Sequence, residues 1–191
     1  MLEELIKIDK ELFLYLNGLG TPVWDGFWVY LSRTLSFITI PIYSLLLFYT
    51  YRTFGLKNTA YILAALILLL LGTEQLSIIF KNSVARLRPC HDDAIRDLVR
   101  NVKNHCGGKF GYFSAHAANS SALASYFSVV FFRKNKLVLF LLAPWSLLVC
   151  YSRIYLGVHF PLDVLTGLSF GVFFGWLFAT LVQKLKIFKN V

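Results

Sequence analysis

The sequence predicts an all-α fold, an integral membrane helical bundle of about five transmembrane helices plus an N-terminal interfacial amphipathic helix. The first observation behind this prediction is composition: 57% of the residues are hydrophobic and the mean hydropathy is +0.63, whereas soluble domains are about 45–50% apolar. The second is that several apolar runs are long enough to cross a hydrocarbon core of about 30 Å. The third is that most charged residues lie between these runs. We therefore expect residues 1–191 to form one membrane-embedded domain.

Residues 1–20 are predicted to form the interfacial helix. At helical spacing one face of this segment is apolar and the other is charged, which is typical of a helix that lies in the membrane interface. The apolar face comprises Leu2, Leu5, Ile6, Leu12, Phe13 and Leu16. Asp9 breaks the pattern. Because the segment lacks the features of a cleaved secretory signal, we expect it to remain in the mature protein.

Five segments are predicted to cross the membrane, at residues 23–51, 58–84, 115–132, 137–155 and 161–182. Arg33 and Pro41 interrupt the first of them, and an arginine in an apolar segment usually faces protein or reaches the interface. The connections between the other segments are short, except for a long polar loop at residues 87–113.

The basic residues predict the orientation in the membrane. Five crossings place the short basic connections 51–57 and 133–136 and the basic tail, with Lys184, Lys186 and Lys189, on one side and loop 87–113 on the other. Loop 87–113 is also basic, so counting Lys and Arg alone does not decide which side is cytoplasmic. If the loop cations are set aside as ligands of an anion, the short basic connections are expected to be cytoplasmic, as such connections usually are. We therefore expect a multi-pass protein of the inner (cytoplasmic) membrane with loop 87–113 on the extracytoplasmic face. Since the net charge of +9 is distributed in this way, it indicates contact with the bilayer and anionic lipid, and we expect no nucleic-acid partner.

Two cysteines lie in the long loop. In an oxidising compartment Cys90 and Cys106 would form a disulfide that closes about 17 residues and contributes roughly 3 kcal/mol. Two alternatives stay open, namely two free thiols and a metal site. The neighbouring residues that permit a metal are His91, Asp92, Asp93 and His105, although no recognised zinc spacing is present.

The segment 152–163 contains a histidine and an aspartate at helical spacing. His159 and Asp163 are four residues apart, near Pro161 at the expected first turn of the last helix. A carboxylate that accepts a hydrogen bond from one ring nitrogen leaves the other nitrogen free to attack an electrophile. The alternative interpretation is a salt bridge at a helix start.

The segment 113–116 predicts a helix N-terminus that can bind an anion. Ser114 would be the N-cap, and the free amides of Ala115 and His116 would point outward at the positive helix end. His116 would then lie beside the anion and could protonate a departing oxygen. A purely structural cap is the alternative.

Three cations accompany these groups. Lys81, Arg88 and Arg153 lie at the ends of different predicted spans, on the same side of the membrane as the two histidines. Arginine can bind two phosphate oxygens through its planar fork. Converging cations and backbone amides are what phosphoryl transfer requires, whereas each cation alone could simply reach the interface.

Together these residues resemble the signature of the type 2 phosphatidic acid phosphatase superfamily. That signature is Lys, six residues, ArgPro; then ProSerGlyHis; then SerArg, five residues, His, three residues, Asp. The matching positions are Lys81, Arg88, Pro89, Ser114, His116, Ser152, Arg153, His159 and Asp163. Phe113 replaces the proline and Ala115 the glycine; neither change removes a catalytic group, but the alanine methyl narrows the expected phosphate pocket.

The resemblance implies a mechanism that uses no metal and no cofactor. His159 would attack phosphorus to give a phosphohistidine, Asp163 would orient it, and His116 would protonate the leaving group and then activate water. The phosphate would be held by Lys81, Arg88, Ser114, the Ala115 amide and Arg153.

The resemblance also implies a lipid phosphate as substrate. Candidates are undecaprenyl pyrophosphate, phosphatidylglycerol phosphate, phosphatidic acid and lipid A 1-phosphate. A phosphotransferase using the same residues and a non-catalytic protein that binds anionic lipid are the alternatives. Halide oxidation, known in soluble relatives, does not fit so apolar a chain.

Further polar residues have less specific interpretations. Glu74, two turns before Lys81, would either tune the site or brace helix packing. The remaining loop cations are expected at a solvated surface, and contact with a headgroup or anionic lipid is the alternative. They are Arg86, Arg96, Arg100, Lys103 and Lys109.

Overall fold

A computed structural model describes residues 1–103 and 106–184, and within these ranges the fold is an all-α bundle of six helices, as predicted. The helices are α1 (Leu2–Gly18), α2 (Pro22–Leu31), α3 (Thr39–Val84), α4 (Ala115–Phe131), α5 (Leu137–Tyr155) and α6 (Pro161–Lys184). Two short 3-10 helices, η1 (Pro89–His91) and η2 (Arg96–Leu98), lie in the long loop. His105, Lys186 and Lys189 lie outside the described residues.

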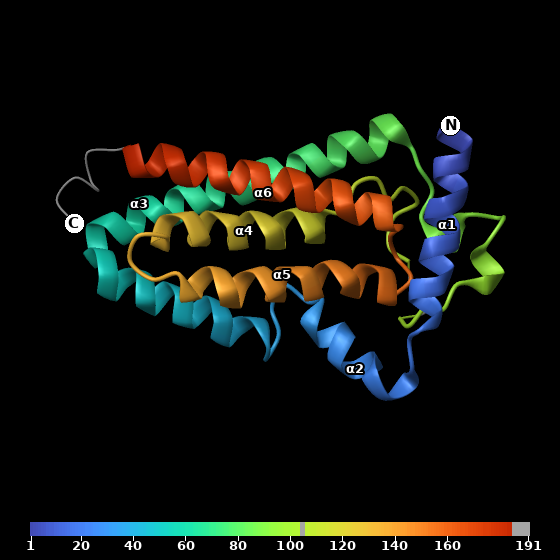
Figure 1. Ribbon diagram of the computed structural model, residues 1–191, viewed down its shortest axis with the longest axis horizontal. Coiled ribbons are helices and arrows are strands. Elements are labelled where there is room, and N and C mark those ends of the chain that lie inside the picture. The colour runs from blue at the N-terminus through green and yellow to red at the C-terminus, as the bar shows by residue number, and fades with distance from the viewer. Residues whose placement is uncertain (104–105, 185–191) are drawn as a thin grey trace.

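The long helices run side by side, and α1 crosses one end of the bundle (Figure 1). The loop between α3 and α4 covers the same end, while the α4–α5 connection lies at the opposite end. Within the bundle α4 packs most extensively against α6 and then against α5. This arrangement gathers the start of α4, the end of α5 and the start of α6 beneath the loop and α1.

Three of the described helices are long and apolar enough to cross a membrane, namely α3, α5 and α6. The prediction of about five spans is therefore supported only in part. The predicted span 115–132 corresponds to α4, which has only 17 residues, most of them buried. Its many alanines and serines suit a helix enclosed by other helices, because small residues allow close approach of neighbouring backbones.

The predicted first span, 23–51, is wrong. Helix α2 ends at Leu31 and α3 begins at Thr39. Between them, the Ser36 hydroxyl accepts hydrogen bonds from the Thr39 and Ile38 amides at 3.2 and 3.3 Å, and the Thr39 hydroxyl donates to the Thr34 carbonyl at 2.9 Å. Such local side-chain bonds compete with the helical backbone pattern and interrupt the segment.

The predicted connection 51–57 contains a kink that divides α3 into two helical parts, although helical turns continue up to the kink on both sides. The only non-helical backbone inside α3 is at Gly55, with φ 73° and ψ 170°. Glycine adopts positive φ without steric cost. The two parts of α3 diverge from this turn at the end of the bundle opposite α1 (Figure 1).

Helix α1 forms as predicted, but its buried face is not the predicted apolar face. The buried side chains are Asp9, Phe13 and Asn17, one helical turn apart. The Asn17 amide group donates to the carbonyls of Ile154 and Tyr155 at 3.0 Å, where the end of α5 leaves carbonyls without helical partners. The apolar side chains left exposed include Leu2, Leu5, Ile6 and Leu12. This exposed apolar surface is suited to a membrane interface.

Candidate functional site

The residues of the three polar motifs gather at the end of the bundle that α1 crosses. Lys81 lies in the last turn of α3, His116 at the start of α4 and Arg153 in the last turn of α5. His159 lies in the turn between α5 and α6, and Asp163 in the first turn of α6. Lys81 and Arg153 interact electrostatically with both histidines, and the histidines interact with each other. The two imidazoles and the cations therefore share one site.

His159 is placed to use one ring nitrogen as a nucleophile. Its side chain is buried, and its Nδ1 lies 3.5 Å from Oδ2 of Asp163. That distance is longer than a charge-assisted hydrogen bond of about 2.7–2.9 Å, and such catalytic contacts commonly tighten when substrate binds. Because Nδ1 faces the carboxylate, Nε2 is the nitrogen available for attack.

The charge state of His159 suits this role. Burial holds the pKa of His159 well below its ordinary value, and the positive charges of Arg88, Arg153 and Lys81 lower it further. The imidazole is therefore neutral near pH 7, as a nitrogen nucleophile must be.

The backbone around His159 is closely enclosed. Gly157 adopts φ 76°, and a Cβ there would lie 2.7 Å from the Arg100 carbonyl oxygen. Gly111 lies against the histidine and aspartate, since a Cβ there would lie 3.1 Å from Oδ2 of Asp163 and 3.6 Å from Nδ1 of His159. Both positions therefore favour glycine, and the loop backbone approaches the pair closely.

The start of α4 has the predicted cap. The Ser114 hydroxyl accepts a hydrogen bond from the Ala117 amide at 3.4 Å, and the Ser114 amide donates to the Asp163 carbonyl at 3.0 Å. The first helical amides, including those of Ala115 and His116, have no helical partner and form the positive end of the helix. The Ser114–Asp163 bond ties this anion-binding end to the helix that carries the aspartate.

Two of the three predicted cations retain free donors. Within the described residues Lys81 forms no ion pair, and Nε of the buried Arg153 has no hydrogen-bond partner. One terminal nitrogen of Arg153 donates to the Ser32 hydroxyl, which orients its guanidinium. Arg88 donates through Nε to the Phe110 carbonyl at 3.2 Å and through Nη1 to the Cys106 carbonyl at 3.0 Å. Positive charge with free donors at a helix N-terminus forms a site for a phosphate.

Sequence reasoning missed two residues beside this site. Arg86 was expected at a solvated surface, but its Nη1 lies 2.9 Å from Oδ1 of Asp163 and its Nη2 lies 2.5 Å from Oδ2 of Asp9. The only signal in the sequence was that Asp9 breaks the amphipathic pattern of residues 1–20.

The other loop cations divide into two groups. Arg100 was also expected at a solvated surface, but it binds Asp25 at 2.6 Å and lies over the Tyr155 ring. Arg96 is exposed, as expected, and pairs with Asp93 at 2.7 Å. The loop is therefore attached to α1 and α2 by specific ion pairs.

Glu74 braces two helices and lines a cavity. Its Oε2 accepts a hydrogen bond from the Asn119 amide at 2.9 Å, and Oδ1 of Asn119 accepts from the Thr73 hydroxyl at 2.6 Å. The cavity, of about 570 Å³, extends from His116 and Asn119 between α2, α3, α4 and α5. Its remaining walls are largely apolar, with side chains such as Leu46, Leu66, Leu123, Phe127 and Trp145. An apolar chain attached to a group at His116 fits such a space.

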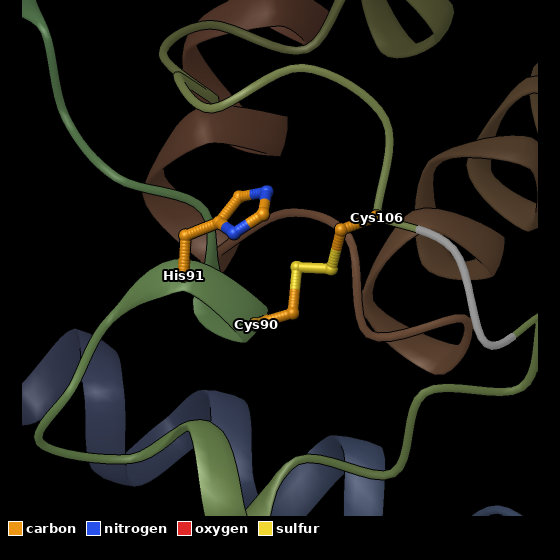
Figure 2. A group of neighbouring side chains, drawn as sticks. All are labelled: Cys90, His91 and Cys106. Carbon is orange, nitrogen blue, oxygen red and sulfur yellow. A yellow bond between two sulfur atoms is a disulfide. The ribbon is translucent and has the colours of Figure 1, made fainter.

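The loop cysteines form a disulfide. Cys90 and Cys106 are bonded with a Cα–Cα separation of 6.3 Å, and Figure 2 shows His91 beside the bond. Disulfide sulfurs are not thiolates, so the three residues form no metal site while the bond is intact. Asp92 pairs with Lys10 and Asp93 with Arg96. Of the three alternatives, the structure therefore contains the disulfide. The bond holds Cys106, whose carbonyl accepts a hydrogen bond from Arg88.

Replacing both loop cysteines with serine is expected to lower the free energy of unfolding by about 3 kcal/mol, because the cross-link restricts the unfolded chain. Thermal unfolding of the detergent-solubilised protein measures this change. A reducing agent should shift the wild-type transition to that of the double variant and leave the variant unaffected. An unchanged transition in reduced wild-type protein would show that the bond contributes nothing.

Comparisons with known proteins find relatives of this chain in sequence and in structure. The model of the PAP2 superfamily matches residues 58–187. A lipid A 4′-phosphatase of Bacteroides thetaiotaomicron is 36% identical over 97% of this chain and 81% of its own length. A lipid A 4′-phosphatase of Porphyromonas gingivalis is 36% identical over 91% of this chain and 72% of its own length. The crystal structure of a transmembrane PAP2-type phosphatidylglycerolphosphate phosphatase from Bacillus subtilis superposes with a TM-score of 0.72, at 21% identity, over 96% of this chain and 88% of that chain.

Proposed function

The chain belongs to the PAP2 superfamily and is a multi-pass membrane lipid phosphatase, and from this premise we propose that it hydrolyses the 4′-phosphate of lipid A. The two lipid A 4′-phosphatases compared above each match more than nine-tenths of the chain. The sequence had suggested the 1-phosphate of lipid A among several candidates, and these relatives favour the 4′ position instead.

The observation that carries the catalytic part of the proposal is the pairing of a buried neutral His159 with Asp163 beside unpaired cations. In the first step Nε2 of His159 forms a bond to phosphorus while the bond from phosphorus to the sugar oxygen breaks. His116, in its protonated form, donates a proton to that oxygen and becomes neutral. In the second step His116 takes a proton from water, the hydroxide attacks phosphorus, and the phosphorus–nitrogen bond breaks to release inorganic phosphate. Asp163 stabilises the charged imidazole of the intermediate.

The phosphate oxygens would be bound by the groups whose hydrogen-bond donors are unpaired. Lys81 and Nε of Arg153 are unpaired within the described residues, and the Ala115 and His116 amides lie at the helix N-terminus. Ser114 and Arg88 complete this set. These donors stabilise the charge on the equatorial oxygens in the transition state, which is the main requirement of phosphoryl transfer. Every step uses side chains and water, so we propose a metal-independent reaction.

The lipid would enter from the membrane side of the site. The apolar cavity reaches His116 from between the helices, so an acyl chain can remain in an apolar environment while its headgroup reaches His159. The basic α4–α5 connection lies at the far end of the bundle from this site (Figure 1). Because short basic connections are usually cytoplasmic, we propose that the active site opens on the extracytoplasmic face.

The purified protein is expected to release phosphate from bisphosphorylated lipid A with a higher kcat/KM than from the other candidate lipids, in detergent containing a chelator. The comparison panel is phosphatidylglycerol phosphate, phosphatidic acid and undecaprenyl pyrophosphate. Mass spectrometry of the lipid A product, with fragmentation of each sugar, identifies the position that loses phosphate.

Each alternative gives a different outcome in this assay. Loss of the 1-phosphate, or a higher kcat/KM on another lipid, would contradict the proposed substrate. Phosphate transferred to a second lipid without release would indicate a phosphotransferase. Activity abolished by the chelator would contradict metal independence, and equal release by wild type and His159→Ala would favour the non-catalytic alternative.

A further inference from the structure

Arg86 connects the interfacial helix to the aspartate that orients the proposed nucleophile. Its Nη1 donates to Oδ1 of Asp163 at 2.9 Å and its Nη2 to Oδ2 of Asp9 at 2.5 Å. The side chains of both acids are almost fully buried, with 0% and 2% exposed. A guanidinium between two carboxylates satisfies charges that would be costly to bury alone.

The same contacts hold the turn from His159 to Asp163 on several sides. Oδ1 of Asp9 accepts a hydrogen bond from the Leu162 amide at 2.9 Å. Oδ2 of Asp163 accepts one from the Phe160 amide at 3.0 Å, and Cζ of Arg86 lies 4.2 Å from the centre of the Phe160 ring. Rotation of the carboxylate away from His159 would break one or more of these contacts.

Within the described residues Arg86 is the cation that forms a salt bridge with Asp163. Arg88 interacts with Asp163 only at longer range, since its Nε and Nη1 donate to the carbonyls of Phe110 and Cys106. Arg86 is the side chain whose hydrogen bond to Asp163 favours the ionised form of that buried acid and fixes the direction of its carboxylate. An ionised, fixed carboxylate is what a charged imidazole intermediate requires.

We propose that Arg86 is a positioning residue for the nucleophile and that Asp9 of α1 holds Arg86 in place, so that docking of the interfacial helix forms part of the active site. The inference rests on the proposed roles of His159 and Asp163. Arg86 would not contact the substrate, and its loss should therefore reduce turnover rather than binding.

The kinetic test compares Arg86→Gln, Arg86→Lys and Asp9→Asn with wild type. Arg86→Gln should lower kcat by about 100-fold, the effect of a small misplacement of a reacting group, with KM changed less than about threefold. Arg86→Lys should recover part of the activity, because an ammonium keeps the charge but cannot form the two-sided fork. Arg96→Gln removes an exposed arginine of the same loop and should leave kcat unchanged.

A double-variant cycle tests whether Asp9 acts through Arg86. Asp9→Asn alone should lower kcat by about tenfold, and adding it to Arg86→Gln should cause little further loss, because residues in one network are not additive. Full additivity would show that Asp9 does not act through Arg86. If Arg86→Gln does not fold, an Asp9→Asn variant with wild-type melting temperature and wild-type kcat overturns the proposal.

Orthovanadate binding separates this inference from the proposed function, because it needs no lipid. The vanadium atom can accept a fifth ligand, so the affinity for vanadate depends on an aligned His159 nitrogen. The affinity for inorganic phosphate depends only on the cations. By titration calorimetry, Arg86→Gln should weaken vanadate binding at least about tenfold and leave phosphate binding unchanged. If Arg86→Gln weakened the binding of both ions equally, or of neither ion, the positioning role would be overturned. If the wild-type protein released phosphate from no lipid while Arg86→Gln still weakened vanadate binding selectively, the proposed function would be refuted. The positioning role of Arg86 would stand.

Discussion

Replacing His159 with alanine is expected to reduce phosphate release from the lipid substrate by about 10⁴-fold or more, since loss of a covalent nucleophile removes the chemical pathway itself. The structure offers no substitute nearby within the described residues, because the neighbouring imidazole of His116 lies at the anion-binding end of α4 rather than against an aspartate. KM should change little if the cations supply most of the substrate affinity. Initial rates over a range of lipid concentrations measure both parameters.

Two further histidine variants sharpen this test. His116→Ala should lose less activity, by about 10²–10⁴-fold, because proton transfer contributes that much and water can partly replace it. His91→Ala is a matched control, since His91 is exposed beside the disulfide (Figure 2). Acid-labile, base-stable labelling by a phosphate-labelled lipid should be present in wild type and absent from His159→Ala. Retention of a tenth or more of the wild-type rate by His159→Ala would assign the nucleophile elsewhere.

The positions of the candidate site residues at the helix ends were predictable because their spacing is local. His159 and Asp163 are four residues apart at the start of a helix, and Ser114 immediately precedes one, so neither inference needs the tertiary fold. The family resemblance then related the separate motifs to one another. Arg86 and Asp9 could not be found in this way, since 77 residues separate each from its partner in the bridge. Their pairing depends on how α1 crosses the bundle.

The observed helices differ from the predicted ones where hydrogen bonds between near neighbours or a single glycine shape the backbone, because hydropathy does not record either effect. The apolar pattern of 23–51 continues across Ser36 and Thr39, and only their hydrogen bonds to nearby backbone show that the helix is interrupted. The bend at Gly55 lies within the predicted connection 51–57, but a single residue with positive φ takes the place of the expected loop. Hydropathy predicted helix α1 and its exposed apolar face, but it could not predict the buried face, which contains Asp9 and Asn17, whose polar groups bind Arg86 and backbone carbonyls.

The close contact between α4 and α6 is the packing feature on which the site depends most. Gly167, Gly171 and Gly175 recur at every fourth position of α6 and face α4. A Cβ at Gly171 would lie 2.0 Å from the Ser121 hydroxyl oxygen, 2.3 Å from the Ala118 carbonyl oxygen and 2.9 Å from the Ala122 amide. These distances are far below van der Waals contact, so any side chain at this position must push the two helices apart. The stripe lets the helices approach as small residues do in other membrane bundles.

Gly171→Val is therefore expected to destabilise the protein by at least about 3 kcal/mol, at the upper end of the cost of overpacking, because the backbone of α4 opposes the new atoms in addition to the Ser121 side chain. For a chain of this length that corresponds to a fall in melting temperature of about 6–12 °C, measurable by thermal unfolding in detergent. Gly72→Val is the matched control, since Gly72 also lies within a membrane-spanning helix but a Cβ there would have nothing within 4 Å. Equal melting temperatures for the two variants would mean that α6 does not pack on α4 as described.

The same substitution should affect catalysis beyond its effect on stability. Helix α4 carries Ser114 and His116, α6 carries Asp163, and the Ser114 amide donates to the Asp163 carbonyl at 3.0 Å. Separation of the helices at Gly171, two turns from Asp163, would move the phosphate-binding amides relative to the nucleophile. Gly171→Val protein that remains folded below its melting temperature should therefore show a reduced kcat, while Gly72→Val retains the wild-type value. Wild-type kcat in folded Gly171→Val would instead show that the turn around His159 is held by the Arg86 bridge and loop alone, independently of the helix contact behind it.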